Sequence, residues 1–586
     1  MRFLNIPRLI LLAIVLWTGF SCTELDLVQQ DAASVGSWYT TEDQFRQSVN
    51  ELYRTEYWIM DALEGWTDDV QTRSDIDQIQ AGTLSSEFGH GASQWFIIYK
   101  GITRANVVAE ALEKQNGVLT DEKAKQFIGE VNFARAFFWT YLITHYGDVP
   151  FYEGELTIEE SFEVGRTNKQ EILQKIYEYY DIAVENLPES YSGTEFATKG
   201  AAYALKARSA IYLNDFETAA AAAKECMDLG VYKLHPDFQE LFLPTTKSSK
   251  EIIFKISRSK EFNVIATPIT IRGMLPRTFG GYAGNQPSWP LLASFECVDG
   301  LPIDESPLFD PRNPFKNRDP RLLMTIVPFG SLADGDGRTP DQGTEFLGVD
   351  FTSHPEHKQI MSYLTNKMVT NNDTRSIVQW ASFNGLYWKK SLSEDWKDYN
   401  TDPDRIIIRY ADVLLMYAEA KIELNQIDQS VLDAMNEVRD RAYAKSQFTN
   451  PEITTTDQSE LRFKVRNERR SEFALEGLRY MDLIRWKLAV KAMSGNIYGM
   501  LNVDSNANVN VAPTGKLMDD IVEPGLWFWG LTPEIDQDGL PQFENLLNAG
   551  MARVLNKMNF PERQYLWPIP QDEILLNDNL TQNPGY

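Results

Sequence analysis

The stretch "LKARSAIYLNDF" (Leu205–Phe216) returns in a second form as "MYAEAKIELNQI" (Met416–Ile427). The identical pairs are Ala207 with Ala418, Ile211 with Ile422, Leu213 with Leu424, and Asn214 with Asn425. Each copy runs into a second helical pattern, and small alanines allow close approach of two helices. The repeat predicts helical hairpins of the tetratricopeptide kind, about 34 residues long, which must stack on neighbours to bury their apolar faces.

Two further pairs of helical segments extend this pattern. "VNFARAFFWTYLITHYG" can pair with "KQEILQKIYEYYDIAVENL", and "LRFKVRNERRSEFALEG" can pair with "YMDLIRWKLAVKAM". The segment that starts "TTEDQF" opens with a Thr/Glu/Asp cap typical of a helix start. We therefore predict a mainly α protein with four tetratricopeptide-like helical hairpins.

Residues 233–405 interrupt the helical pattern with a large loop-rich insertion. This region is rich in Pro, Gly, Asn and aromatic residues, and its short apolar runs "EIIFKIS", "RLLMTIVP" and "GLYWKK" predict short strands. Recognition usually lies on long loops held by a rigid frame. The predicted regions are a signal peptide (1–21), a region with the first hairpins (22–232), the insertion (233–405) and a region with the remaining hairpins (406–586). We expect the insertion to form much of the ligand face.

The amino terminus carries the pattern of an export signal. Arg2 precedes an apolar run, Leu9–Phe20, which as a helix spans about 18 Å and is too short for the ~30 Å core of a bilayer. Small residues stand just before Cys22, as in a bacterial lipoprotein signal. We expect removal of 1–21 and attachment of lipid to Cys22; the alternative is an ordinary secretory signal that ends near a chance cysteine.

Composition and charge exclude several classes of protein. The 586 residues carry a net charge of −27, the opposite of what a nucleic-acid-binding protein needs. No CxxC or Cys/His cluster occurs, so we expect no zinc site, and Cys226 and Cys297 are predicted to be buried thiols. Asp334, Asp336 and Glu345 have the spacing of a calcium loop, but Arg338 breaks the pattern. We predict no cofactor and no metal.

At this point the sequence resembles the SusD/RagB family of outer-membrane lipoproteins of the Bacteroidetes. The resemblance rests on several segments in order: "IYKGITRAN", "ARAFFWTYLITHYGDVPFY", "CVDGLPIDESPLFDPRNPFKNRDPRLLMTIVP", "IIIRYADVLLMYAEAKIEL", "NERRSEFALEGLRYMDLIRW" and "LWPIPQDEILLNDNLTQNPGY". It implies a SusD-like fold and a surface-exposed lipoprotein that captures glycans. It also implies delivery to a SusC-like TonB-dependent outer-membrane barrel. RagB-like members handle peptides, which leaves peptide capture as an alternative.

Several tryptophans and arginines are predicted to have structural roles. Trp58, Trp95, Trp139 and Trp486 fall in helical patterns and are expected in the core, and Trp567 is expected to be a packing anchor. The arginines of "NERRSEFALEGLRYMDLIRW" alternate with glutamates near i,i+4 spacing, which predicts salt bridges within and between helices.

Candidate ligand residues lie in the irregular segments. No HExxH, GxSxG or P-loop motif occurs, so we predict no enzyme activity, with a secreted glycan hydrolase as the less favoured alternative. Exposed aromatic rings can stack on the apolar faces of sugars, while Asp and Arg can bind hydroxyls. Family members bind ligand with loops from these same regions but share no fixed motif. The candidate carbohydrate-binding residues are Trp66, Asp68, Asp69, Tyr282, Trp289, Arg375 and Trp396.

Overall fold

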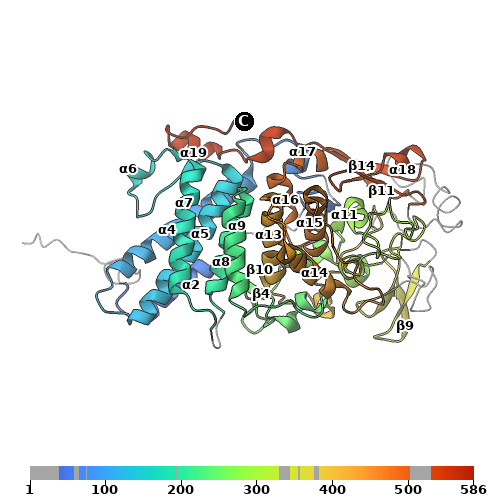
Figure 1. Cartoon of the computed structure of the whole chain (residues 1–586), viewed down its shortest axis with the longest axis horizontal. Helices are drawn as coiled ribbons and strands as arrows, with labels where there is room; N and C mark the ends of the chain where they lie inside the picture. Colours follow the sequence, from blue (N-terminus) through green and yellow to red (C-terminus); the bar gives the residue numbers. More distant parts are fainter. Residues whose placement is uncertain are drawn as a thin grey trace, which may run out of the picture.

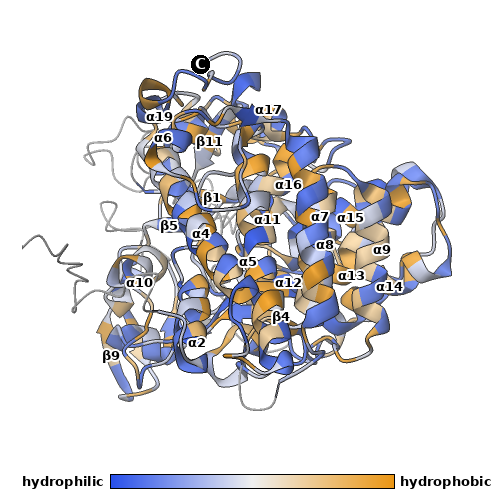
Figure 2. Cartoon of the chain, turned by 90° about the vertical axis from the view of Figure 1, so that its left-hand side faces the viewer, coloured by the Kyte–Doolittle hydropathy of each residue, from blue (hydrophilic) through white to orange (hydrophobic). Residues whose placement is uncertain are grey.

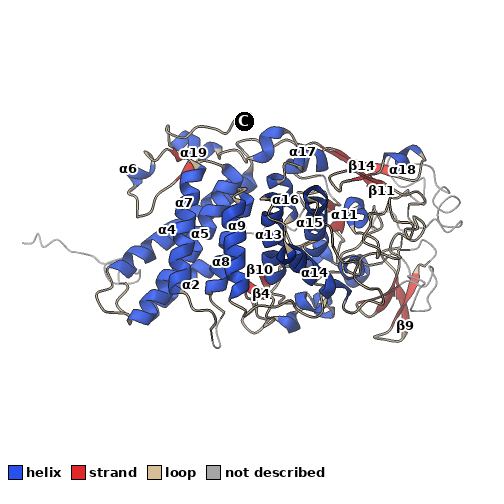
Figure 3. Cartoon of the chain, in the orientation of Figure 1, coloured by secondary structure: helices blue, strands red, loops and turns tan. Residues whose placement is uncertain are grey.

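The computed structural model describes residues 38–58, 65–73, 76–191, 195–328, 344–353, 357–374, 382–501 and 529–586. Long helices fill one half of the molecule, and loops with short strands fill the other (Figures 1 and 3). The longer helices of the first part are α2 (Glu42–Asn50), α4 (Gly89–Glu113), α5 (Asp121–Tyr146), α7 (Lys169–Asn186), α8 (Lys199–Tyr212) and α9 (Phe216–Asp228). Those of the second part are α13 (Tyr410–Glu423), α14 (Gln429–Tyr443) and α15 (Gln458–Glu472), which the short helices α16 (Arg479–Arg485) and α17 (Ala489–Ala492) follow.

The predicted hairpins are present and stack in a row. Helix α5 packs on α7, α8 on α9, and α13 on α14, while α9 packs on α13 and so joins the two copies of the repeat (Figure 1). In the fourth pair, α15 is followed by two short helices, α16 and α17, in place of one long one. Lys487 lies between them with a φ of 59°, a left-handed conformation that a helix cannot continue through.

The repeat also fixes the turns within the hairpins. Asn214 and Asn425, which align in the repeat, adopt φ values of 61° and 54° at the end of α8 and α13. Asparagine tolerates this left-handed conformation better than most residues. The side chains of Asp215 and Asp428 then cap the next helices, α9 and α14, by accepting from backbone N–H groups.

Strands pair mostly in twos and tie distant segments together. The two-stranded pairs are β1 (Val70–Thr72) with β5 (Asn285–Pro287), β2 (Val149–Pro150) with β3 (Arg166–Thr167), β4 (Ile252–Ile256) with β10 (Arg405–Arg409), β11 (Gly495–Gly499) with β14 (Arg553–Met558), and β12 (Glu534–Ile535) with β13 (Pro541–Gln542). A four-stranded antiparallel sheet runs in the order β6 (Thr344–Phe346), β7 (Val349–Phe351), β8 (Gln359–Ser362), β9 (Lys367–Thr370). Because β4 opens the insertion and β10 ends it, their pairing returns the chain to the helical half.

Short helices complete the molecule. They are α3 (Gln78–Ala81), α6 (Ile158–Ser161), α10 (Pro268–Met274), α11 (Trp289–Ser294), α12 (Arg321–Thr325), α18 (Glu544–Asn548) and α19 (Gln571–Leu576). The 3-10 turns are η1 (Glu51–Tyr53), η3 (Glu240–Phe242), η4 (Pro244–Thr246), η5 (Arg277–Phe279), η6 (Glu394–Asp398) and η8 (Glu562–Tyr565).

The strand prediction for the insertion is confirmed in one place and wrong in another. "EIIFKIS" contains β4, but "RLLMTIVP" begins with α12. Asp319 explains this difference, since its carboxylate accepts from the backbone N–H of Arg321 at 2.9 Å and satisfies a donor at the helix start. In "GLYWKK", only Trp388 forms a bridge, to Ile326.

The described residues form two hydrophobic clusters, one in each half. The first lies among the helices and includes Trp58, Trp95 and Trp139, as predicted, while Trp486 is partly buried against it. Trp567 is 1% exposed in the same cluster, which confirms its packing role. The second cluster surrounds Trp289 and Trp388 in the loop-rich half.

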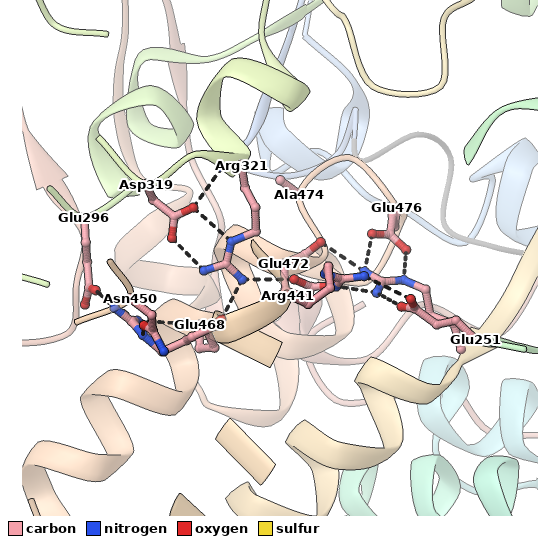
Figure 4. A network of polar contacts seen from close by, with 12 residues as sticks. Glu251, Glu296, Asp319, Arg321, Arg441, Asn450, Glu468, Glu472, Ala474 and Glu476 are labelled. Carbon is pink, nitrogen blue, oxygen red and sulfur yellow. Dashed lines mark hydrogen bonds and ion pairs between the residues drawn. The ribbon is translucent and has the colours of Figure 1, made fainter. Parts of the chain in front are cut away.

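A buried network of ion pairs connects the halves (Figure 4). Arg409 at the end of β10 lies 2.7 Å from Glu251 and 2.6 Å from Glu472 of α15. Arg441 of α14 pairs with the same two glutamates, and Arg321 of α12 lies 2.9 Å from Glu472. A buried carboxylate is tolerated only when cations and donors surround it, and Glu472 has three guanidinium partners.

The predicted ion pairing of "NERRSEFALEGLRYMDLIRW" is confirmed, but with other partners than i,i+4 spacing suggests. Arg469 pairs with Asp412 of α13 and Asp482 of α16. Arg485 pairs with Glu419 and Asp482. These cations therefore bind elements together across the fold.

Of the helices in the described ranges, none combines the length and apolar character needed to cross a bilayer. Cys22 and the expected signal peptide lie outside the described residues.

Candidate functional site

The structure brings together the two segments that the sequence singled out as ligand loops. Strand β1 pairs antiparallel with β5, with Val70 opposite Pro287 and Gln71 opposite Gln286. The backbone N–H of Ser288 donates to the carbonyl of Asp69 at 2.9 Å. Residues near 66–72 and 282–289 thus belong to one region of the fold, where β1 and β5 lie side by side (Figure 2).

Asp68 and Asp69 are structural residues in this region and not exposed ligand groups, so that part of the hypothesis is wrong. Both are buried, at 4% and 1% exposed. Asp68 lies 2.8 Å from Arg470 and 2.9 Å from Arg479, while Asp69 lies 2.5 Å from Arg470. Burial alone would raise the pKa of Asp68, but attraction to Arg470 and Arg479 lowers it. The two aspartates attach the β1 segment to α15 and α16.

The tryptophan candidates are also buried, which corrects the expectation of exposed rings. Trp66 is 6% exposed and packs edge-on against Tyr480 and Trp567. Trp289 is 1% exposed, and its indole N–H donates to the carbonyl of Asn384 at 2.9 Å. Trp396 is 3% exposed. A ring covered on both faces cannot stack on a ligand at the surface.

Of the predicted site residues that the structure describes, Tyr282 alone is exposed, with 48% of its surface accessible. It lies in a turn that rests on α10, because its backbone N–H donates to the carbonyl of Arg272 at 2.8 Å. A Cβ atom at Gly281 would approach the carbonyl oxygen of Leu275 to 1.9 Å, so the close approach of this turn requires glycine. Arg375 lies outside the described residues.

Arg272 and Tyr399 complete the surface around Tyr282. The Arg272 guanidinium carbon lies 5.6 Å from the ring centre of Tyr282 and 5.5 Å from that of Tyr399. The Tyr399 hydroxyl donates to the carbonyl of Gly280 at 2.5 Å, which holds its ring against the same turn. We call these three residues the tyrosine–arginine face. It lies on α10, on the opposite side of Figure 2 from α9 and α14.

The base of this face is held by a buried carboxylate. Asp373 accepts from the backbone N–H groups of Arg277 and Thr278, at 3.1 and 2.7 Å, just after α10. Burial raises the pKa of Asp373, although its hydrogen bonds with Thr278 oppose this effect. The exposed Asn372 donates its backbone N–H to the Thr278 hydroxyl, so polar groups border the aromatic rings.

The arrangement offers groups that can bind a ligand. Tyrosine rings offer flat apolar faces, and a guanidinium offers a fixed fork of donors for hydroxyl or anionic oxygens. Within the described part of the chain, no group of three or more His, Cys, Asp or Glu side chains could hold a metal ion. The calcium-type spacing falls almost wholly on residues outside that part.

Sequence reasoning named Tyr282 but did not name Arg272 or Tyr399. Tyr399 is three residues after Trp396, in the segment "EDWKDYN". Arg272 lies on α10, and the turn "GGYAGN" (280–285), which contains Tyr282, follows that helix in the chain. The flanking pattern could not have found them, since Trp396 and Tyr399 both stand among polar residues in "SEDWKDYN", although only the ring of Trp396 is fully buried.

Comparison with known proteins identifies the family of the chain. A sequence profile described as "SusD family" matches residues 250–586. The chain belongs to the SusD family. A second profile, described as "Starch-binding associating with outer membrane", matches residues 32–213.

Relatives of this SusD family protein match it over most of its length. SusD-like protein P38 of Formosa agariphila is 24% identical over 92% of this chain and 99% of its own length. SusD-like protein P25 of the same organism is 24% identical over 70% of this chain and 73% of its own length. The fold is therefore shared across the family at low identity.

Solved structures of SusD family members superpose on the whole molecule. A SusD-like carbohydrate binding protein from Bacteroides fragilis is 26% identical, with a TM-score of 0.72, and the match covers 93% of this chain and 99% of that one. A laminarin binding SusD-like protein is 18% identical, with a TM-score of 0.59, and the match covers 94% and 100%. The mainly helical fold with small sheets that the sequence predicted is confirmed.

Proposed function

We propose that this SusD family protein binds a glycan on the tyrosine–arginine face, without cleaving it. The observation that carries this proposal is the exposed ring of Tyr282, held beside Arg272 and Tyr399 on a rigid turn. One face of a sugar ring would stack on Tyr282, while Arg272 donates to its oxygens. The solved relative from B. fragilis, described as carbohydrate binding, supports the same ligand class.

We further propose that the bound glycan passes to a TonB-dependent outer-membrane barrel. Lipid on Cys22 would hold the chain at the outer membrane, on the cell surface, although its net charge of −27 would be repelled by an anionic membrane. The profile name "Starch-binding associating with outer membrane" supports this location. A Cys22→Ser variant should be released in soluble form, and wild-type protein purified in detergent should bring a large barrel with it. A Cys22→Ser variant that stays in the membrane fraction would contradict the anchor.

Calorimetry with a panel of neutral and anionic oligosaccharides, and of short peptides, tests the ligand class. Tyr282→Ala should weaken binding of the best glycan at least about tenfold, since aromatic anchors contribute most at binding surfaces. The melting temperature should stay unchanged because Tyr282 is exposed. Phe96→Ala is the matched control, as it removes an aromatic ring 64% exposed on α4 in the helical half.

Three outcomes would count against the proposal. Equal binding by wild type and Tyr282→Ala would remove the site. Binding of peptides but of no glycan would favour the peptide-capturing alternative. Release of shorter sugars from a bound glycan would show hydrolase activity in place of simple capture.

A further inference from the structure

The structure contains a second candidate site behind the tyrosine–arginine face. A cavity of ≈ 330 Å³ lies between α10, the β4–β10 pair, η3, η6 and the 475–477 turn. Thr270 and Met274 of α10 line it, whereas Arg272 stands two residues from each and hence about 200° around the helix. The cavity and the tyrosine–arginine face therefore use opposite sides of α10.

The lining of the cavity joins apolar walls to positive charge. Its apolar residues are Leu241, Phe242, Leu243, Ile252, Met274, Trp388, Trp396, Pro403, Ile406 and Leu475. Its cations are Lys247, Arg258 and Arg405, and its carboxylates are Asp404 and Glu476. Positive residues outnumber negative ones here, although the whole chain carries −27. Such a local reversal of sign favours an anionic ligand.

Both carboxylates of the lining are already neutralised. Asp404 lies 2.7 Å from Lys255 and 3.5 Å from Lys247. Glu476 lies 2.6 Å from Lys390 and 2.6 Å from Arg409. Neither carboxylate is therefore left to serve as the counter-ion of Arg258.

Arg258 is the cation of the lining that lacks an ion-pair partner among the described residues. Its guanidinium donates to the carbonyl of Pro403 at 3.2 Å, and no described carboxylate oxygen lies within the 4.0 Å of an ion pair. Burial lowers its pKa, although the charge of Asp404 opposes this effect. A partly buried guanidinium without a carboxylate gains strongly from an anionic oxygen brought by a ligand.

A second unused donor belongs to the residues that line this cavity. The indole N–H of Trp396 is buried and has no hydrogen-bond partner in the described part of the chain. Buried donors in native proteins are nearly always paired, so this one indicates a missing acceptor. Arg258 and Trp396 can together supply donors to an oxygen-rich group.

We infer that this cavity binds one anionic sugar unit, a uronate or a sulfated sugar, with its acidic group on Arg258 and the indole N–H of Trp396. The volume is at the small end of the roughly 300–1,000 Å³ of small-molecule sites, which suits one or two sugar units. This inference deepens the proposed function, on which it rests. It assigns the acidic unit to the cavity and the rest of the glycan to the tyrosine–arginine face.

Calorimetry with three matched disaccharides tests the inference. One is neutral, one has glucuronate as its terminal sugar, and one has a 6-sulfated sugar in that terminal position. Both anionic disaccharides, or one of them, should bind at least about tenfold more tightly than the neutral one, as expected for a charge-assisted hydrogen bond. Tighter binding of the uronate alone, or of the sulfate alone, identifies the acidic group. Equal binding of all three would overturn the inference.

Variants locate the acidic group within the protein. Arg258→Gln should abolish the preference for the anionic disaccharide, Arg258→Lys should keep part of it, and Trp396→Phe, which keeps a ring but lacks the N–H, should reduce it. Melting temperatures show that each variant is folded. An unchanged preference in Arg258→Gln would overturn the inference, as would an Arg258-dependent preference for peptide C-terminal carboxylates over both anionic sugars.

Tyr282→Ala separates this inference from the proposed function. If both hold, Tyr282→Ala weakens binding of long glycans and keeps the preference for the anionic disaccharide. If the tyrosine–arginine face is not a binding site, Tyr282→Ala has no effect on any sugar, while the Arg258-dependent preference remains. If only the cavity inference fails, Tyr282→Ala weakens binding of long glycans, and wild type shows no preference for the anionic disaccharide.

Discussion

Arg409, the last residue of β10, and Glu472, the last residue of α15, lie 2.6 Å apart with both side chains buried. The contact joins the strand that follows the loop-rich insertion to a helix of the repeat frame, and Figure 4 shows Glu472 within the surrounding network. Glu472 also meets Arg321 and Arg441. Removal of one charge from such a network leaves the others buried without compensation.

Glu472→Gln should therefore lower the free energy of unfolding by about 3–5 kcal/mol. The glutamine cannot neutralise three guanidinium groups. Urea unfolding followed by circular dichroism measures the change. Glu460→Gln, an exposed position on the same helix, is the matched control and should stay within about 0.5 kcal/mol of wild type. Equal effects of the two substitutions would show that the network does not stabilise the fold.

Acid should destabilise the protein through Asp412. Burial would raise the pKa of this carboxyl, but attraction to Arg208 and Arg469 lowers it to about 2, below its ordinary value of 3.8. A group with a depressed pKa in the folded state stabilises that state above its unfolded pKa and loses this contribution as the pH falls. The free energy of unfolding should thus be steady above about pH 5 and decline between about pH 4 and 2.

The pH series should be repeated with Asp412→Asn. This variant should start less stable at neutral pH and lose less on acidification, by on the order of 2 kcal/mol, because the titrating group is gone. Identical pH slopes for variant and wild type would show that other carboxyls dominate the acid response.

Asp69→Asn should lower stability without changing the affinity for glycan. Its carboxylate is buried against Arg470, so the loss should be on the order of 3 kcal/mol. The affinity of the folded fraction should match wild type because Asp69 does not reach the surface. Asp433→Asn on the exposed side of α14 is the control for stability. A large loss of affinity at full stability would restore the ligand role that the sequence suggested.

Cys226 and Cys297 should resist thiol reagents in the folded protein. Both are free and buried, and burial raises the pKa of Cys226 to about 12 and that of Cys297 as well. Thiolate is the reactive form, so little of it is present at neutral pH. In a soluble chain that starts after Cys22, a colourimetric thiol assay should detect no fast-reacting thiol before unfolding and two after it. Fast labelling of the native chain would contradict this burial.

The helical frame could be predicted because its signals are local. Alanine spacing, helix caps and the aligned Asn214 and Asn425 all act within one or two turns of chain, and the structure pairs α5 with α7, α8 with α9, and α13 with α14 as expected. "RLLMTIVP" misled because apolar runs this short do not distinguish a strand from a helix, and the carboxylate of Asp319 accepts from the first backbone N–H of the helix that forms there.

The sequence by itself thus determined the helical repeat frame, and it predicted in which irregular segments candidate ligand residues lie. The tertiary structure decided which side chains of those segments face solvent. Trp289 and Tyr282 are seven residues apart in one irregular segment, yet Trp529 and Phe543 cover the first, and the turn on α10 leaves the second exposed. The same holds for Asp69, whose partner Arg470 comes 401 residues later. Exposure and ion pairing depend on contacts between distant parts of the chain, and local pattern carries no record of them.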